Sequence, residues 1–343
     1  LTTALGFLTL GFADILPFIE FGVFTALGVI FAWFLAVFLL PVLLVFIPVH
    51  TSPSYEFGRK WPFFLYQWVI NHKRSIIGIS LLITAISGIG VSQLKVDSLL
   101  YEELSAGDRY SSSLHFFDKH FSGIRPVEIY IETLDDSTVF TSETLARIDS
   151  LDDYLTEFYG VRGIYSINTQ IKRINRAMHR GLPHHFRLPS NAATLEKILH
   201  LVKNQYHSLA LNTILTPDYK ATVIAAKISD LGSYEIGKRN RALSEFLEQT
   251  FPPDQYLFRI TGRALLLDKS NEVIAYNLGW GLLIALGAVS VMMGFLFKSL
   301  KMALMALIPN LLPLLIVAGV MGLFGVGLKM STAVIFTIAF GIA

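Results

Sequence analysis

The chain contains no cysteine, and only 16% of its 343 residues are charged. Without cysteine it has no disulfide, no thiol nucleophile and no thiolate ligand for a metal. The charges nearly cancel, leaving a formal net charge of +2, and no basic stripe interleaved with aromatic residues stands out. A nucleic-acid partner is therefore not expected.

Charge is absent above all from long apolar runs. Hydrophobic residues make up 53% of the chain, and the mean hydropathy is +0.54. The four longest uncharged runs are Phe21–Ile47, Ile76–Leu94, Val273–Phe297 and Met302–Leu328. Because a helix of about 20 apolar residues crosses a hydrocarbon core of about 30 Å, the sequence predicts a polytopic α-helical membrane protein.

The charges that are present concentrate in one segment. Residues 95–272 hold 21 Lys or Arg and 23 Asp or Glu, which predicts a water-soluble domain with a net charge of −2. Lys and Arg accumulate in cytoplasmic loops, and the basic residues of the loop 48–75 are Arg59, Lys60, Lys73 and Arg74. This loop is therefore predicted to be a cytoplasmic linker. The second and third apolar runs, read as crossings at 76–94 and 273–297, then place the soluble domain on the extracytoplasmic side of the cell (cytoplasmic) membrane.

Both ends of the chain lie within apolar runs. Leu1 opens the run Leu1–Ala13, and the run Ser331–Ala343 is shorter than a full membrane crossing. No start methionine or signal peptide is visible. We therefore expect an internal piece of a longer polytopic protein, with two cut helices at its ends and four complete ones between them.

Hydrophobic periodicity within the soluble segment predicts alternating strands and helices. Alternating, β-branched residues are typical of strands, and apolar residues at a spacing of about 3.6 are typical of helices. The expected order is Val127–Glu132, Thr141–Phe158, Val161–Ile167, then Ala221–Ile228, Ser233–Thr250 and Tyr256–Thr261, in each case strand, helix, strand. Two such units predict an α+β ferredoxin-like (split β-α-β) domain, with Ile171–Tyr206 as a largely helical insertion.

Three histidines in one short segment raise the possibility of a metal site. His179, His184 and His185 are close in sequence, and imidazole is a common zinc ligand. Glycine, proline and arginine lie among and beside them, however, and no carboxylate stands at ligand spacing. We therefore interpret this segment as a solvated loop, and no metal site is predicted.

Two pairs of carboxylates are the remaining candidates for catalysis. Asp135–Asp136 lies in a turn-like composition, and Asp152–Asp153 is expected on the polar face of a helix. No partner base, nucleophile or phosphate-binding loop accompanies either pair. The sequence thus predicts no catalytic residue, no cofactor-binding residue and no enzyme.

The last complete apolar run contains a polar residue between two prolines. Proline within a helix removes a backbone donor, so Pro309 and Pro313 predict a kink or local unwinding around Asn310. One interpretation is a kink that only shapes helix packing. The other is a hinge that flexes during transport, with Asn310 lining a polar path. The glycines that follow, Gly319, Gly322, Gly325 and Gly327, predict a close approach of helices.

Several separated motifs resemble the resistance-nodulation-division (RND) permease superfamily, in its MMPL-type, sterol-sensing-domain-like branch. The motifs are Leu1–Phe7; Phe21-Gly22 with Ala26-Leu27-Gly28 and Leu39-Leu40-Pro41; Ile308–Pro313 with Gly322; and Ser331-Thr332-Ala333 with Phe340–Ala343. They are similar to the fifth, sixth, ninth and tenth helices of that superfamily, in the same order. The resemblance covers nearly the whole chain and is weakest over residues 171–206.

The resemblance implies two six-helix halves, each with an outer domain after its first helix. Residues 1–47 would then be the end of the first transmembrane half, with helices five and six. Residues 76–94 would be helix seven, and residues 273–343 helices eight, nine and a truncated ten. It also implies coupling to protons through acidic residues of the fourth and tenth helices. The fourth helix is absent from this chain, and the acids of the tenth are expected just after Ala343, so no relay residue is assigned.

The expected function is proton-driven export, or efflux, of hydrophobic or lipid-like molecules. Membrane lipids, the substrate and protons are the implied partners, and a homo-oligomer or a periplasmic partner is left open. A nearly neutral outer domain agrees with this reading, because it would not steer strongly charged cargo. The main alternative is a sterol- or lipid-sensing receptor that binds without pumping. A membrane-anchored enzyme is a third option, for which no motif is found.

Overall fold

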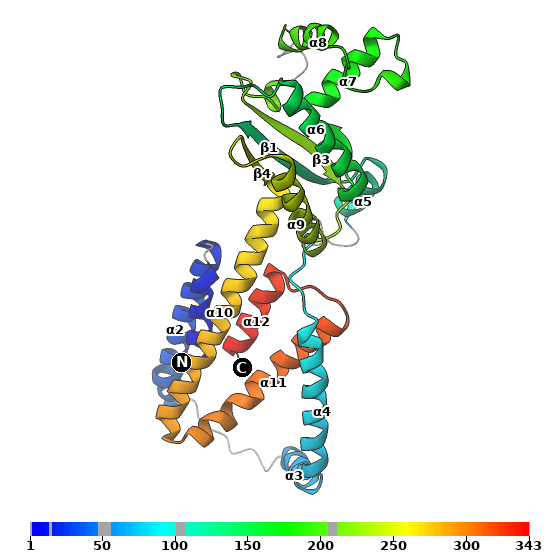
Figure 1. Cartoon of the computed structure of the whole chain (residues 1–343). Helices are drawn as coiled ribbons and strands as arrows, with labels where there is room; N and C mark the ends of the chain where they lie inside the picture. The colour runs from blue at the N-terminus through cyan, green and yellow to red at the C-terminus, as the bar shows by residue number, and fades with distance from the viewer. Residues whose placement is uncertain (1, 14–15, 47–55, 101–107, 205–210, 343) are drawn as a thin grey trace. The chain divides into compact units, whose positions relative to one another are not determined.

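The computed structural model describes residues 2–13, 16–46, 56–100, 108–204 and 211–342. The chain divides into two compact units, one of residues 1–97 with 271–343 and one of residues 98–270. The first unit, called the membrane unit below, is helical. The second, called the sheet unit, combines helices with a four-stranded sheet (Figure 1).

The first unit is built from apolar helices. In chain order they are α1 (Thr2–Leu8), a 3-10 turn (Thr9–Ala13), α2 (Leu16–Phe46), α3 (Glu56–Asn71), α4 (Lys73–Ser92), α10 (Arg263–Phe297), α11 (Leu300–Leu323) and α12 (Met330–Ile342). Within the described residues, α2, α4, α10 and α11 are long and apolar enough to cross a membrane. Their apolar side chains are largely exposed in the isolated chain, as expected for surfaces that contact lipid. The prediction of a polytopic membrane protein is confirmed.

Helices extend beyond the apolar runs in two places. The stretch 48–75, expected to be a loop, contains α3 and the first residues of α4, and residues 47–55 lie outside the described part. Helix α10 begins at Arg263, well before the expected Val273. Charged residues are excluded from a membrane span but are good helix formers, so an apolar run marks the span and not the ends of the helix.

Three sets of contacts hold the helices of the first unit together. Helix α1 packs against α2 and α12 around a small core that includes Phe7, Leu10 and Ala26. Helices α10 and α11 meet at Ala285 and Leu314. Helix α4 packs along α11. Two of these contacts, α1 with α12 and α4 with α11, join helices that are far apart in the sequence.

The second unit is built on an antiparallel sheet with the order β2-β3-β1-β4. Its strands are β1 (Arg125–Thr133), β2 (Arg162–Tyr165), β3 (Ala221–Ile228) and β4 (Tyr256–Thr261). The register aligns Ile129 of β1 with Ile224 of β3 and Ile260 of β4. Burial alternates along β1, so that one face of the sheet is turned to the core. All four expected strands are confirmed.

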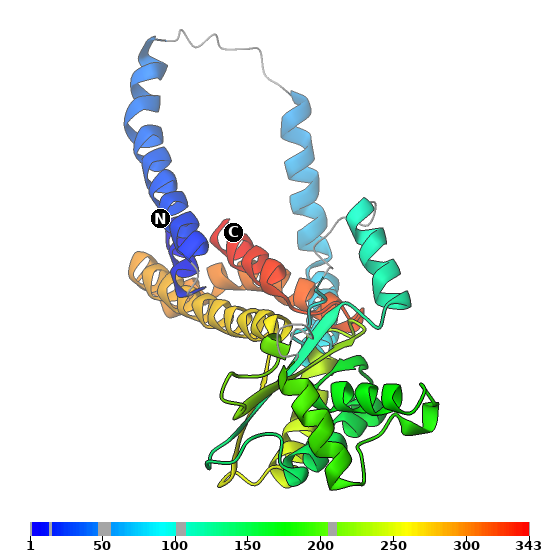
Figure 2. The same cartoon turned by 90° about the horizontal axis from the view of Figure 1, so that it is seen from above.

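Helices α6 (Ser142–Tyr154) and α9 (Ser233–Thr250) pack against each other and share a core with the sheet. A π-helical turn, Leu155–Tyr159, prolongs α6, and Gly160 ends it with a positive φ of 84°. Two further helices, α7 (Ile167–Met178) and α8 (Ala192–Asn204), account for the predicted helical insertion. Helix α5 (Arg109–His120) precedes the sheet and stands off it, as the teal helix of Figure 2 shows.

Candidate functional site

The closest helix contact in the membrane unit joins α4 to α11. A Cβ atom added to Gly90 of α4 would lie less than 3.0 Å from the backbone of Gly319, and one added to Gly322 would overlap the carbonyl of Gly90. Gly319 in turn faces Ser87, which is 4% exposed. Such small residues let two membrane helices approach until their backbones touch. The predicted packing role is therefore confirmed for Gly319 and Gly322.

The other two glycines of this group, Gly327 and Gly325, differ from each other. Gly327 lies against the backbone and Cβ of Asp97, so it too allows a close approach. A Cβ at Gly325 would meet open space, and its φ is +68°. Gly325 therefore serves the left-handed turn after α11, where other residues are strained.

Asn310 lies in the middle of α11, between the two prolines. At about 1.5 Å per residue, it stands about 15 Å from the start of a helix about 36 Å long. Its side chain is partly buried, whereas Pro309 and Pro313 are exposed. Its amide makes no hydrogen bond with any described part of the chain. A polar group at mid-membrane depth is costly unless it is hydrated or paired, so Asn310 is a candidate for a polar path.

The backbone of α11 stays helical through both prolines. The local unwinding considered from the sequence is therefore not observed. Each proline still lacks the N–H that would bond the carbonyl four residues earlier, which affects the carbonyls of Met305 and Pro309. These carbonyls and the Asn310 amide bring polar groups to one stretch of an otherwise apolar helix.

The histidine loop is held by its own residues. The rings of His179 and His185 stack with centroids 3.8 Å apart, and His184 is exposed. Buried Asn175 donates hydrogen bonds to the backbone carbonyls of His185 (3.1 Å) and Arg187 (2.9 Å). Partial desolvation and the neighbouring histidines lower the pKa of His185. Within the described ranges, no group of histidines and acids has the geometry of a metal site.

The first carboxylate pair lies in an exposed turn, as expected. Asp135 accepts hydrogen bonds from the side chain and backbone of Ser137, which lower its pKa. Asp136 forms an ion pair of 3.0 Å with Lys220. Each carboxylate therefore has a structural partner.

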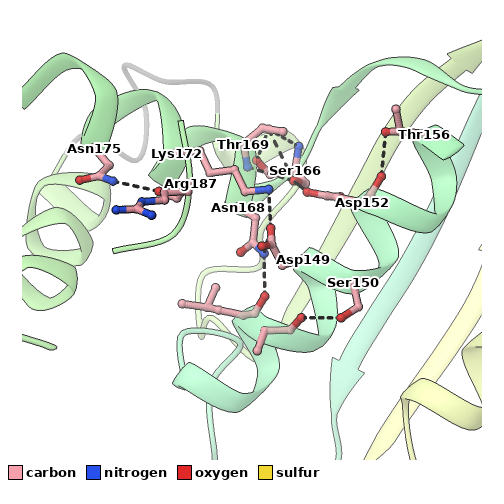
Figure 3. A network of polar contacts seen from close by, with 12 residues as sticks. Asp149, Ser150, Asp152, Thr156, Ser166, Asn168, Thr169, Lys172, Asn175 and Arg187 are labelled. Carbon is pink, nitrogen blue, oxygen red and sulfur yellow. Dashed lines mark hydrogen bonds and ion pairs between the residues drawn. The ribbon is translucent and has the colours of Figure 1, made fainter. Parts of the chain in front are cut away.

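The second pair differs from the expectation at Asp152. Asp153 is exposed, but Asp152 is only 4% exposed and faces the start of α7 (Figure 3). Its Oδ2 accepts a hydrogen bond of 2.7 Å from Ser166, the N-cap of α7. The placement on a solvated face was wrong, because α7 covers this side of α6. Periodicity within one helix cannot reveal a partner that comes from another.

Burial dominates the chemistry of Asp152. Desolvation raises its pKa to about 7, and the hydrogen bond from Ser166 and the charge of Lys172 only partly oppose this. Its second oxygen is buried without a hydrogen-bond partner in the described part. Beside it, Lys172 pairs with Asp149 at 2.5 Å (Figure 3). This network joins α6 to α7.

A buried arginine is the main polar feature that the sequence did not predict. Arg125, at the start of β1, is 1% exposed and contacts Asp230 at 3.0 Å and Asp268 at 2.6 Å. Burial alone would lower its pKa, but the two carboxylates raise it above the ordinary value. The cluster fastens the beginning of α10 and the segment before α9 to the sheet. The three charged residues are spread over 143 positions of the chain, so no local sequence pattern could predict that they meet.

A small pocket borders this cluster. Among its lining residues are Arg125, Asp268, Tyr159 and Asn240, and the Tyr159 hydroxyl donates to Asn240 Oδ1 at 2.7 Å. The Nη2 atom of Arg125 is buried and has no partner among the described atoms. A single water molecule can satisfy such a donor. The pocket therefore lies beside the ion pair that joins the beginning of α10 to β1.

Comparison with known proteins agrees with the membrane architecture. A structure of the hedgehog release protein Disp from the water bear Hypsibius dujardini is similar, with a TM-score of 0.55 and 12% sequence identity. The match covers 99% of this chain but 47% of that protein, so the chain spans about half of its length. No curated protein matches. At this identity the likeness shows a shared fold only.

A family model gives a more specific result. The model described as "MMPL family" matches residues 166–343, which include the second half of the sheet unit and helices α10, α11 and α12. The match covers more than half of the chain and agrees with the motifs found in its helices. The chain therefore belongs to the MMPL family, within the RND superfamily, and is an integral membrane protein.

Proposed function

We propose that this chain is part of a transporter that exports hydrophobic or lipid-like molecules and is driven by protons. The observation that carries the proposal is the match of the MMPL family model to residues 166–343. The chain's apolar helices, with a polar asparagine at mid-depth of α11, support it. The similar water-bear protein is described as a release protein, which also favours export.

We infer that the unit of residues 98–270 is a ferredoxin-like domain. In the split β-α-β arrangement each β-α-β unit leaves room for a strand of the other. The sheet order β2-β3-β1-β4 has this interleaved form, and α6 and α9 each follow the first strand of a unit. This topology supports the assignment, and α7 and α8 are additions between the two units.

The proposed orientation places this unit outside the cytoplasm. Basic residues favour the cytoplasmic side of short connections. Lys73 and Arg74 open α4, while Lys298 and Lys301 lie at the connection between α10 and α11. With the membrane crossings α4 and α10 on either side of residues 98–270, alternation supports an extracytoplasmic domain and a cytoplasmic linker at 48–75.

The proposed role of the membrane helices follows from the contacts of α11. Its contact with α4 is close and rigid, because backbones meet at Gly90, Gly319 and Gly322. The stretch around Asn310 lacks two helical hydrogen bonds and is more easily bent. We assign this stretch as the place where α11 flexes and where hydrophilic groups or protons pass. The acidic relay itself is expected beyond Ala343.

A sterol- or lipid-sensing receptor is the second candidate. Its support is the same family fold, which serves binding as well as pumping. The transporter and the receptor can be separated by measuring the release of a fluorescent lipid from proteoliposomes to an external acceptor. The release is measured with and without an imposed pH gradient. The transporter releases lipid only with the gradient, and a protonophore stops it. If the protein binds lipid saturably but releases it only at the background rate, with or without the gradient, export is refuted and the receptor is supported.

A further inference from the structure

Helix α5 is amphipathic, but it turns its apolar side away from its own unit. Tyr110, Phe116, Phe117 and Phe121 are 73%, 53%, 48% and 56% exposed. A helix on the surface of a soluble domain normally does the reverse, burying its apolar stripe and exposing its polar face. The apolar face of α5 therefore needs a partner other than the core beneath it.

The inward side of α5 carries Ser111, Leu114 and Asp118, of which only Leu114 is apolar. Ser111 is buried, and Asp118 Oδ1 accepts hydrogen bonds from the backbone N–H groups of Ile124 and Asp230, both at 3.1 Å. These contacts set the rotation of the helix about its axis. The aromatic side is thus held outward by specific bonds and is not a consequence of a loosely placed helix.

The outward aromatic residues form one continuous surface. At about 100° per residue, Tyr110, Ser113, Phe116 and Phe117 share one arc of the helix, and Phe121 follows directly after it. The rings of Phe117 and Phe121 are 5.1 Å apart, and those of Phe116 and Phe121 are 6.0 Å apart. We call these four aromatic side chains the aromatic face.

The charges of α5 favour a lipid partner over a protein core. The exposed charged residues of the helix are Arg109 and Lys119, both basic, whereas the acidic Asp118 is turned inward. An aromatic face flanked by basic residues is typical of helices that lie in the membrane interface, where the cations attract anionic headgroups. Tyrosine, present here as Tyr110, is enriched at the same depth.

We propose that the aromatic face of α5 inserts into the headgroup region of the lipid bilayer and anchors the sheet unit to the membrane surface. The occupant of this surface is phospholipid, with the rings at the boundary of headgroups and acyl chains and the basic residues toward anionic headgroups. The proposal does not depend on pumping, and it applies equally to a transporter and to a receptor.

The absence of cysteine makes a direct test straightforward. A nitroxide label attached to the thiol of the Ser113→Cys variant lies within the aromatic arc. The same label on the Ser112→Cys variant lies on the adjacent polar side. The two serines are matched, because both are exposed and both hydroxyls donate to the carbonyl of Arg109. The full chain is reconstituted in vesicles of phosphatidylcholine and phosphatidylglycerol, and collisions of each label with oxygen and with a water-soluble nickel chelate are measured.

The expected result is a label at 113 that collides severalfold more with oxygen than with the nickel chelate, and the reverse at 112. Adding Phe116→Ser and Phe117→Ser to the 113 variant should restore nickel collisions, with the label at 112 as the unchanged reference. Equal nickel access at 112 and 113 would overturn the proposal, since the face would then be in water. Protection of 113 from both reagents would also overturn it, because a protein surface would then cover the face.

Discussion

Replacing Gly90 with alanine tests the idea that α4 and α11 are held by direct backbone contact. The added Cβ would lie less than 3.0 Å from the backbone of Gly319, and backbone atoms cannot move aside as a flexible side chain can. The helices must separate or shift, and overpacking of this kind costs about 1–3 kcal/mol. We expect Gly90→Ala to lower the free energy of unfolding of the membrane unit by that amount relative to a matched control.

The matched control is Gly88→Ala, two residues away on the same helix. A Cβ at Gly88 would meet nothing within 4 Å. Both substitutions gain the same helix propensity, up to about 1 kcal/mol, so this contribution cancels in the comparison. Reversible unfolding in mixed micelles, followed by circular dichroism as the denaturing detergent is increased, gives both free energies. If Gly90→Ala is as stable as Gly88→Ala, the argument from backbone contact is refuted.

Three further predictions concern buried polar groups. The folded-state pKa of Asp152 is about 7, against an ordinary value of 3.8, so the folded protein binds the extra proton and the stability of the sheet unit should fall as pH rises from about 4 to 7. Asp152→Asn should flatten this dependence in urea titrations at several pH values, whereas Asp153→Asn should leave it in place. Arg125→Met should cost about 3–5 kcal/mol of unfolding free energy, because two carboxylates lose their buried partner; a loss below 1 kcal/mol would contradict the buried ion-pair assignment. Asn310→Leu should leave thermal stability unchanged or raised but abolish gradient-dependent lipid release, and normal release would remove Asn310 from the proposed path.

Much of the fold could be predicted because its signals are local. The strand Ala221–Ile228 and the helix Ser233–Thr250 have the bounds expected from periodicity alone. The membrane helices were predicted from their lack of charge, although α10 and α11 begin earlier than the apolar runs. Helix ends are harder to predict, because a helix continues past the membrane boundary wherever its residues tolerate helical geometry.

Contacts between distant residues could not be predicted in the same way. The burial of Asp152 depends on α7, and the charge cluster of Arg125 depends on residues more than a hundred positions away. The face that α5 presents outward is likewise set by the bond from the Asp230 backbone to Asp118. Neither composition nor periodicity contains this information.

Hydrophobic patterning by itself determined that this protein lies in a membrane, and the order of strands and helices in the sheet unit. It did so because the exclusion of charge from lipid and the periods of helix and strand are properties of neighbouring residues. Tertiary structure alone decided which glycines bring helices together, which carboxylates are buried and which face of α5 is free of the core. Those outcomes depend on which surfaces meet in space, and the energies of burial and contact arise only once they do.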